Sequence, residues 1–264
     1  MPEYVLDHQW DGERQRLALM SRLLDPLHRR YLEQLGLQPG VRTLEVGCGN
    51  GSMSAWLAGQ VAPGGRAVAV DLDLSLADAS APGPEFREAD ILAGPVAPGD
   101  FDLVTARAVL HHLPDAEAAV RNLVASTRPG GTVLLIEPDF LPVTVAEPAA
   151  IRDFWTGWLA WSREQGIDYF AGRRLAGMLD RLGLAEVAAS AETALYNGGS
   201  AWARYWQLTV AELRATLEAS GHLDATAIDT FLACCADPGW WTQTIAFTVV
   251  HGRAPNRAAR RPER

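Results

Sequence analysis

The stretch Thr43-Leu-Glu-Val-Gly-Cys-Gly-Asn-Gly-Ser52 decides the fold of this chain. It begins in the apolar, β-prone run 41–46, and the run 52–58 that follows it is typical of a helix. Between them stand three glycines spaced two residues apart, Gly47, Gly49 and Gly51. Glycine adopts positive φ and lets a ligand touch the backbone, and a helix N-terminus presents unpaired N–H groups. The pattern predicts a strand, a glycine turn and a helix that bind a nucleotide-like ligand.

An acidic residue after the next apolar run narrows the class of ligand that the turn could bind. Asp71 lies 20 residues beyond Gly51, at the end of the run 67–70. A carboxylate at that position accepts hydrogen bonds from both hydroxyls of a ribose. The dinucleotide pattern G-x-G-x-x-G needs glycine at position 52, where this chain has Ser52. Asp71 fits any adenosine-containing ligand, NAD included, so this residue alone does not identify the ligand.

Four ordered segments carry a family resemblance. Residues 45–51 resemble the E/D-x-G-x-G-x-G motif of class I S-adenosylmethionine (SAM)-dependent methyltransferases. Residues 70–72 and 89–91 are similar to that family's ribose-binding and adenine-binding segments, and 101–115 with 128–136 to its fourth and fifth strands. The resemblance covers roughly residues 40–140. The chain departs from the family at Arg107, where a small or amide side chain is commoner, and in the short crossover 71–86.

The resemblance implies an α/β fold with a seven-stranded, mostly parallel Rossmann-like methyltransferase sheet. The SAM-binding core spans 41–139, and the last strands, an antiparallel pair, fall at 184–196 and 242–252. We expect the earlier strands near 41–46, 66–71, 84–88, 101–106 and 131–137. A helix over 116–126, capped by Asp115, comes between the last two of these. Ligands of such sheets bind at the carboxyl ends of the strands.

Helical segments outside the core predict a cap over that edge. They span 1–40, 140–183 and 197–241, and a basic tail over 253–264 is expected to be disordered. Pro26, with Asp25 as N-cap, indicates two helices within 17–35. Residues 1–12 are either a loose terminus or a flap over the cofactor.

Tryptophan is concentrated in the predicted cap. Seven of the nine tryptophans lie beyond residue 150. Aromatic residues at helical spacing serve either as core or as the wall of a pocket. An aromatic inner wall would suit a planar or bulky apolar substrate.

The resemblance also assigns cofactor contacts. Glu45 would hold the methionine ammonium, Asp71 the ribose, and Asp90 the adenine amino group. Leu72 and Ile91 would pack on the adenine ring. The complete set is Glu45, Gly47, Gly49, Gly51, Asp71, Leu72, Asp90, Ile91 and Arg107.

Two histidines after the fourth strand are candidates for a general base. Histidine titrates near neutral pH and suits an oxygen or nitrogen acceptor that must lose a proton. In similar small-molecule O-methyltransferases, a histidine of such a pair acts as base and an acid at the end of the fifth strand assists it. The prediction is His111 with Glu137, and His112 and Asp139 are the alternatives. The competing interpretation is that both histidines only cap a helix and pack.

Composition excludes several classes of protein. The net charge of −9 argues against a nucleic-acid partner, and no apolar run reaches membrane-spanning length. All 23 basic residues are arginine, which excludes a P-loop lysine, a pyridoxal Schiff base and a lysine base. The N-terminus lacks a signal pattern, and three cysteines, two of them adjacent, indicate a reducing cytoplasm. No motif with metal-ligand spacing occurs.

These observations favour a cytoplasmic SAM-dependent methyltransferase acting on a small molecule, with S-adenosylhomocysteine as product. The acceptor is an O, N or C atom of an aromatic or bulky apolar compound, which suits secondary metabolism. The alternatives are a SAM-binding protein that catalyses a non-methylating step such as cyclisation, an NAD-dependent oxidoreductase, and a non-catalytic partner subunit. The sequence gives neither the acceptor atom nor the oligomeric state.

Overall fold

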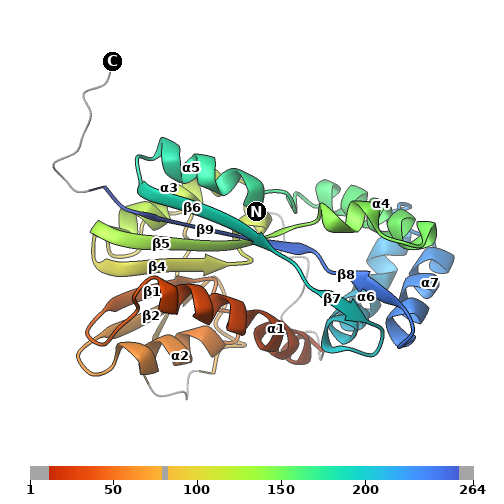
Figure 1. Cartoon of the computed structure of the whole chain (residues 1–264), viewed down its shortest axis with the longest axis horizontal. Coiled ribbons are helices and arrows are strands. Elements are labelled where there is room, and N and C mark those ends of the chain that lie inside the picture. Colours follow the sequence, from red (N-terminus) through yellow and green to blue (C-terminus); the bar gives the residue numbers. More distant parts are fainter. Residues whose placement is uncertain (1–11, 79–82, 256–264) are drawn as a thin grey trace.

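A seven-stranded sheet forms the centre of the molecule (Figure 1). The computed structural model describes residues 12–78 and 83–255. The strand order is β3-β2-β1-β4-β5-β9-β6. The strands are β1 (Arg42–Val46), β2 (Arg66–Asp71), β3 (Glu85–Glu88), β4 (Phe101–Arg107), β5 (Thr127–Asp139), β6 (Ala185–Glu192) and β9 (Ala246–Arg253). Strands β1 to β5 are parallel, and β9 runs antiparallel to both β5 and β6. The predicted fold class is confirmed.

Helices cover both faces of this sheet. α1 (Glu13–Gln34) and α2 (Ser52–Val61) lie on one face, and α3 (Ala116–Ser126) and α5 (Leu175–Arg181) lie on the other (Figure 1). Successive residues of a strand therefore enter different cores. On β5, Leu134 packs in the cluster that contains Leu32 of α1, whereas Leu135 packs with Leu123 of α3. Apolar residues on both faces give the uninterrupted hydrophobic runs that the sequence shows.

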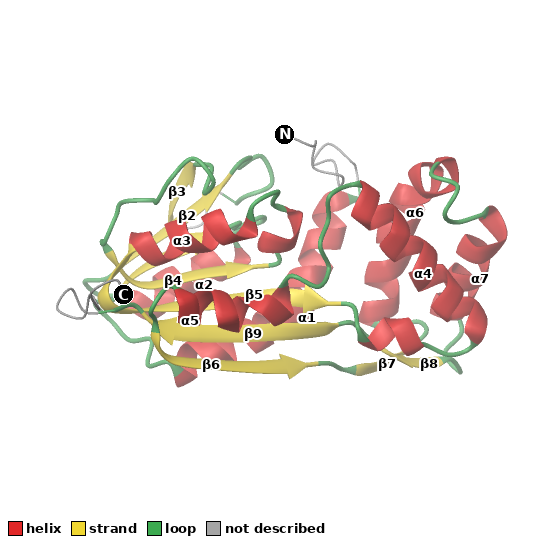
Figure 2. Ribbon diagram, turned by 90° about the horizontal axis from the view of Figure 1, so that it is seen from above, coloured by secondary structure: helices red, strands yellow, loops and turns green. Residues whose placement is uncertain are grey.

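A helical cap stands beyond the carboxyl ends of β4 and β5 (Figures 1 and 2). It contains α4 (Ala149–Glu164), α6 (Ala201–Ala219) and α7 (Ala225–Ala236). Its aromatic residues Phe154 and Trp158 belong to the same buried cluster as Leu24 and Leu32 of α1. Core and cap thus share one hydrophobic interior. No helix among the described residues is long and apolar enough to cross a membrane.

The two final strands are interrupted, which corrects the prediction of single strands over 184–196 and 242–252. β7 (Leu195–Asn197) and β8 (Trp241–Gln243) form a separate two-stranded sheet. The main sheet stops where Ala246 of β9 pairs with Asp139, the last residue of β5. Beyond that point β7 and β8 pair with each other in the two-stranded sheet, which leads into the cap.

Helix α1 is also longer than predicted. It runs without a break through Pro26, so the prediction of two helices, with Asp25 as a cap, is wrong. Pro26 is exposed, whereas Leu24, His28 and Leu32 are buried. Packing of the buried face against the sheet outweighs the hydrogen bond that proline cannot donate. The short crossover is as expected, since no helix forms in 72–78 or 83–84.

The ends of the chain allow only a partial comparison. Strand β9 continues to Arg253, and Ala254 is buried, so the tail predicted over 253–264 does not begin at residue 253. Residues 256–264 lie outside the described part of the chain, as do residues 1–11, which include most of the predicted flap.

Candidate active site

The glycine turn after β1 has the backbone that its sequence predicts. Gly47, Gly49 and Gly51 have φ values of 74°, 53° and 77°, all in the left-handed region that favours glycine. A Cβ atom on Gly47 would lie 2.1 Å from Cγ2 of Val109, in the segment after β4. A Cβ atom on Gly49 would meet nothing within 4 Å. Gly47 is therefore required by close packing, and Gly49 leaves its backbone open to a ligand.

Asp71 joins the end of β2 to this turn. One carboxylate oxygen accepts a hydrogen bond from the Gly49 N–H at 2.8 Å, and the other accepts from the Leu72 N–H at 2.8 Å. The Gly47 N–H donates to the carbonyl of Val70 at 2.8 Å, which holds the turn against the same strand end. Leu72 is 56% exposed at the rim. Asp71 and Gly49 therefore lie next to each other on one surface at the end of β2.

The segment after β3 continues this surface. The Ala89 N–H donates to the Asp71 carbonyl at 2.9 Å, which places residues 89–91 beside the end of β2. Asp90 turns one carboxylate oxygen back onto the Leu92 N–H at 2.8 Å. Ile91 is buried, and its carbonyl accepts from Asn122 of α3 at 2.7 Å. The structure therefore brings the predicted ribose and adenine segments together.

Glu45 is a buried carboxylate near the glycine turn. It is 3% exposed and accepts a hydrogen bond from the Ser54 hydroxyl. Burial raises the pKa of Glu45 from 4.5 to about 7, although Ser54 and the charge of Arg107 favour its ionised form. A cationic group bound beside Glu45 would favour ionisation further, so this carboxylate suits a ligand with an ammonium.

Arg107 at the end of β4 faces α1. Its Nη1 lies 2.9 Å from Oδ1 of Asp25, and both side chains are less than a tenth exposed. Two further contacts hold α1 to the glycine turn. The Ser21 hydroxyl donates to the Asn50 side chain at 3.1 Å, and the Ser52 hydroxyl donates to Ser21 at 3.0 Å. The helix therefore closes one side of the site.

Glu137 organises the turn that carries His111. Helix η1 (Leu110–His112) follows β4, and Glu137 near the end of β5 is fully buried beneath it. The Glu137 carboxylate accepts from three successive backbone N–H groups, those of Val109, Leu110 and His111, at 2.8, 2.9 and 3.2 Å. It also lies 2.7 Å from Nδ1 of His111. A carboxylate only accepts, so Nδ1 carries the hydrogen, and in a neutral imidazole the lone pair is then on Nε2.

The imidazole of His111 is held from its other side as well. The ring of Tyr169 stacks on it with centroids 5.3 Å apart, and the Asp168 N–H donates to the His111 carbonyl at 2.8 Å. His112 lies beside His111, with ring centroids 3.9 Å apart. Burial, then the neighbouring His111 and Arg16, lower the pKa of His112 well below 6.5. His112 is therefore neutral at physiological pH.

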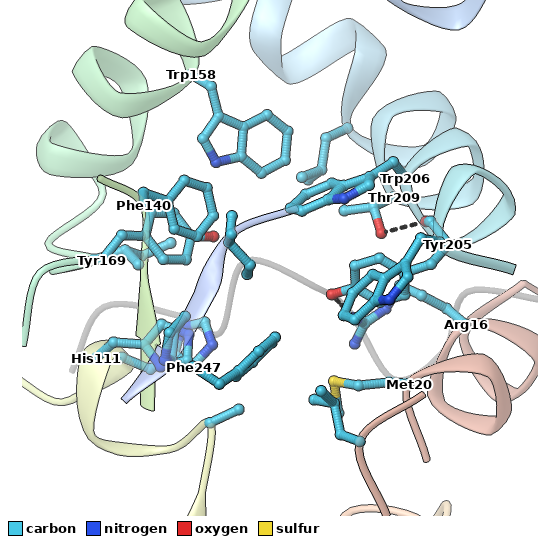
Figure 3. Close-up of a pocket in the computed structure, with 18 of the residues that line it drawn as sticks. Arg16, Met20, His111, Phe140, Trp158, Tyr169, Tyr205, Trp206, Thr209 and Phe247 are labelled. Carbon is cyan, nitrogen blue, oxygen red and sulfur yellow. Dashed lines mark hydrogen bonds between the residues drawn. The ribbon is translucent and has the colours of Figure 1, made fainter. Parts of the chain in front are cut away.

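The side chain of His111 lines an aromatic cavity between core and cap (Figure 3). The cavity encloses about 760 Å³ of atom-free space, counted with the solvent at its mouth. Met20 of α1, Phe140 after β5, Trp158 of α4, Trp206 of α6 and Phe247 of β9 contribute to its wall. The aromatic inner wall expected from the cap is present.

Asp139 stands apart from this arrangement. Nε and Nη2 of Arg173 donate to its two carboxylate oxygens at 2.8 and 2.7 Å, and the Leu141 N–H donates to it at 2.9 Å. Arg173 follows α4 in helix η3 (Gly172–Arg174). Asp139 is not among the described residues that line the cavity. Among the described residues, Glu137 contacts a histidine, whereas Asp139 pairs with Arg173.

Sequence reasoning missed an ion pair in the cavity wall. Arg16 of α1 lines the cavity, and Glu13 binds its guanidinium through two hydrogen bonds of 2.6 Å. The spacing of three residues was the available signal, because residues i and i+3 of a helix are neighbours. Nothing in the sequence shows that this part of α1 faces Tyr205 of α6, to which Arg16 donates at 3.2 Å.

Known proteins share this sequence pattern and fold. The family described as "Methyltransferase domain" matches residues 13–189, more than half of the chain, and the chain belongs to that family. The ubiquinone biosynthesis O-methyltransferase of Xanthomonas campestris pv. campestris (strain B100) is 31% identical over 146 residues, which are 52% of this chain and 59% of that protein. The nocamycin O-methyltransferase of Saccharothrix syringae is 33% identical over 140 residues, 50% of this chain and 48% of that protein.

A solved structure matches over a greater length. The putative methyltransferase of Bacillus halodurans C-125 covers 86% of this chain and 98% of its own, with a TM-score of 0.57 and 20% identity. That identity supports the Rossmann-like methyltransferase fold alone. The present chain spans about half the length of the two curated relatives.

Proposed function

We propose that the protein is a SAM-dependent methyltransferase that methylates a small, planar or bulky apolar molecule. One observation carries the proposal: the glycine turn and the aromatic cavity are joined through a single short segment. Val109 in this segment packs on Gly47, and His111, two residues later, lines the cavity. A cofactor on the turn and an acceptor in the cavity would therefore meet next to His111.

The residues at the strand ends fit the cofactor. Asp71 would accept hydrogen bonds from the ribose, Asp90 would accept from the adenine amino group, and buried Glu45 would pair with the methionine ammonium. Gly49 leaves room for backbone contact, and Ile91 and Leu72 offer apolar surface to adenine. When bound, SAM supplies an electrophilic methyl group on a positively charged sulfur. Arg107 stays a predicted contact, and its pairing with Asp25 places it on the side of α1.

His111 acts as the general base in this proposal. Glu137 fixes Nδ1–H, so Nε2 takes the proton from an acceptor hydroxyl while the oxygen lone pair forms the bond to the methyl carbon. The bound cofactor would supply the methyl group and leave as a neutral thioether, and His111 would hold the proton and its positive charge. The buried Glu137 carboxylate stabilises that charge. The aromatic wall would align the acceptor, and such alignment lowers barriers by roughly 7–11 kcal/mol.

The partner is a small molecule rather than a nucleic acid, in keeping with a net charge of −9. The three cysteines are all free thiols, which fits the reducing cytoplasm. The name of the nocamycin relative supports a place in secondary metabolism, and the names of both curated relatives support an oxygen acceptor.

Calorimetry and a methyl-transfer assay test this function. We expect heat of binding with SAM and S-adenosylhomocysteine and none with NAD. A panel of planar phenols and hydroxyquinones, incubated with methyl-labelled SAM, should yield labelled product and S-adenosylhomocysteine. Binding of NAD instead of SAM would contradict the proposal. Binding of SAM with consumption of an acceptor but no S-adenosylhomocysteine would favour the non-methylating alternative, such as cyclisation.

Replacing His111 tests the proposed base. We expect His111→Ala to lower turnover by ~10²–10⁴-fold, because the proton of the acceptor loses its receiver. Affinity for S-adenosylhomocysteine should change little, since the cofactor contacts lie on other residues. His112→Ala is the matched control and should lower turnover less. Equal turnover of His111→Ala and the unmodified protein would remove His111 from the mechanism.

A further inference from the structure

Ala108 has a backbone conformation that alanine rarely adopts. Its φ is 56°, in the left-handed region that favours glycine. The residue directly follows β4, and its N–H donates to the carbonyl of Ile136 at 2.8 Å. Val109 returns to a negative φ of −119°, and the backbone N–H groups of residues 109–111 all donate to Glu137. The left-handed residue therefore forms the bend that brings these three donors to one carboxylate.

Alanine is an unfavourable residue for this bend. In left-handed backbone a Cβ atom crowds the following carbonyl oxygen, and glycine avoids that strain because it has no Cβ. The chain uses glycine for the same conformation at Gly47, Gly49 and Gly51. Strained residues persist where the surrounding structure holds them, and they cluster at active sites and ligand contacts. Glycine would serve the bend better, so the fold alone does not explain the methyl group of Ala108.

The position of Ala108 offers an explanation. Ala108 is half-buried and lines the aromatic cavity, as His111 does. Val109 beside it packs on Gly47 of the glycine turn. Arg107, on the other side, forms the buried ion pair with α1. Ala108 therefore lies on the short segment that joins the glycine turn to the cavity.

Two other described residues with a Cβ atom have positive φ, and both lie elsewhere. Ala97, with φ 42°, is in the turn before β4, at the opposite end of that strand from Ala108. Glu186, with φ 54°, is in the part of β6 where the register with β9 shifts. Neither is among the residues that line the cavity. Positive φ alone thus marks no site, and Ala108 is distinguished by combining it with a place in the cavity wall.

We propose, on the basis of the proposed function, that Ala108 is a specificity-determining residue for the methyl acceptor. Its methyl group occupies the space beside the accepting hydroxyl, where cofactor and acceptor would meet. Contact with this methyl group holds the accepting oxygen within the ~3–3.5 Å of the methyl carbon that displacement needs. The acceptor class that fits is a planar aryl or enol hydroxyl with a hydrogen, and no larger group, on the neighbouring carbon that faces Ala108.

Two isomeric naphthols test the proposal. In 1,3-dimethyl-2-naphthol, the flanked isomer, both carbons beside the hydroxyl carry a methyl group, so neither orientation of the ring avoids Ala108. In 6,7-dimethyl-2-naphthol, the open isomer, both methyl groups are on the far ring. The full chain is titrated calorimetrically with each, with and without saturating S-adenosylhomocysteine. We expect the open isomer to bind at least about ten-fold more tightly, since one methyl group that misfits a pocket is worth ~10–200-fold. Equal affinities, the reverse order, or no binding of the open isomer would overturn the proposal.

Substitutions of Ala108 identify the residue responsible. Ala108→Gly removes the methyl group and relaxes the backbone, so we expect the two affinities to come within about three-fold of each other and the unfolding temperature to rise. Ala108→Asn adds volume with a residue that tolerates left-handed backbone, and it should weaken binding of the open isomer by at least about ten-fold. An unchanged preference or a lower unfolding temperature in Ala108→Gly would overturn the proposal, as would unchanged binding by Ala108→Asn. If Ala108→Asn does not fold, Ala108→Gly decides.

Ala97 provides the matched control. Ala97→Gly removes a Cβ atom from the same kind of left-handed backbone outside the cavity. It should also raise the unfolding temperature, but it should leave the preference for the open isomer unchanged. A merely structural role of Ala108 predicts the same behaviour of both glycine variants. Loss of the preference in Ala108→Gly alone supports the proposal, and loss in both variants would overturn it.

The two proposals fail in different ways. Absence of heat with S-adenosylhomocysteine, together with a preference for the open isomer that Ala108→Gly abolishes, would remove the methyltransferase function and leave Ala108 as the residue that selects the cavity's ligand. Binding of S-adenosylhomocysteine without a preference between the isomers would overturn the role of Ala108 and leave the methyltransferase function.

Discussion

At the scale of single residues, Glu137 links the fold to the chemistry. Its carboxylate accepts from three consecutive backbone N–H groups and from the His111 imidazole, so it shapes the turn after β4 and selects the imidazole tautomer together. Such an acceptor is costly to alter, because donors that lose it stay buried. The carboxylate touches no substrate in this arrangement and acts through the position of His111.

Glu137→Gln tests this role. Either orientation of the amide turns an NH₂ group toward buried donors, so we expect the free energy of unfolding to fall by about 1–3 kcal/mol and turnover to fall with it. Urea unfolding and initial rates measure the two effects. The exposed Glu186→Gln is the control and should stay within about 0.5 kcal/mol of the unmodified protein. A Glu137→Gln protein as stable and active as this control would contradict the assignment.

Glu45 makes both stability and binding depend on pH. Its pKa is raised from 4.5 to about 7, so between those values the folded protein keeps a proton that the unfolded chain has lost. The contribution of Glu45 to stability therefore declines as pH rises through this window, by at most about 3 kcal/mol. The other groups that act on it are Arg107, Asp25 and Asp71.

Comparison with Glu45→Gln isolates this contribution. We expect the stability of the unmodified protein relative to Glu45→Gln to fall between pH 5 and pH 8, measured by urea unfolding. Affinity for S-adenosylhomocysteine should follow the opposite course. It should weaken below pH 7 in the unmodified protein, because the ammonium prefers ionised Glu45, and be flatter in the variant. A stability difference that is the same at both pH values would contradict the raised pKa.

At the scale of elements, α1 forms a continuous helix although its local sequence predicts a break at Pro26. Pro26 lies inside the helix on the exposed side, and the buried side contacts the sheet through residues such as His28, whose Nε2 lies 2.8 Å from the Thr105 hydroxyl. The helix tolerates the missing hydrogen bond because the buried face fixes its path. The same helix carries Arg16 to the cavity and Ser21 to the glycine turn.

Pro26→Ala should therefore stabilise the protein. Alanine restores the hydrogen bond to the Arg22 carbonyl and removes the clash of the ring, and part of this gain is offset by a more flexible unfolded chain. We expect a gain of about 2 kcal/mol in urea unfolding. The exposed Arg22→Ala in the same helix is the control and should change stability by less than about 0.5 kcal/mol. A loss of stability in Pro26→Ala would contradict this account, because it would show that the proline stabilises the folded protein.

The elements also show where prediction from sequence succeeds. The local sequence was enough to predict the glycine turn and the acid at the end of β2. A left-handed turn favours glycine, as at Gly47 and Gly49, and the ribose contact needs a carboxylate, as at Asp71. The break between β6 and β7 has no such signal: the strand pattern continues past Glu192, whereas the pairing of β6 with β9 ends at Glu192 and Phe247. The continuity of α1 through Pro26 is likewise set by contacts with distant residues.

At the scale of the whole molecule, the cavity lies where segments far apart in the chain meet. Its wall takes some residues from each of six segments, 16–24, 108–112, 138–140, 158–169, 202–213 and 245–247. The sequence indicated an aromatic cap, since tryptophans gather beyond residue 150, but not which of them face the cavity. Arg16 could not be placed there either, because its position depends on how α1 packs against α6.

The crystal structure of the protein with S-adenosylhomocysteine tests the account most directly. We predict density over Gly49, with the ribose hydroxyls within about 3 Å of the Asp71 carboxylate and the sulfur facing the cavity beside His111. The adenine should lie against Ile91 with Asp90 at its amino group. The nucleoside bound inside the aromatic cavity, or a ribose away from Asp71, would contradict the account.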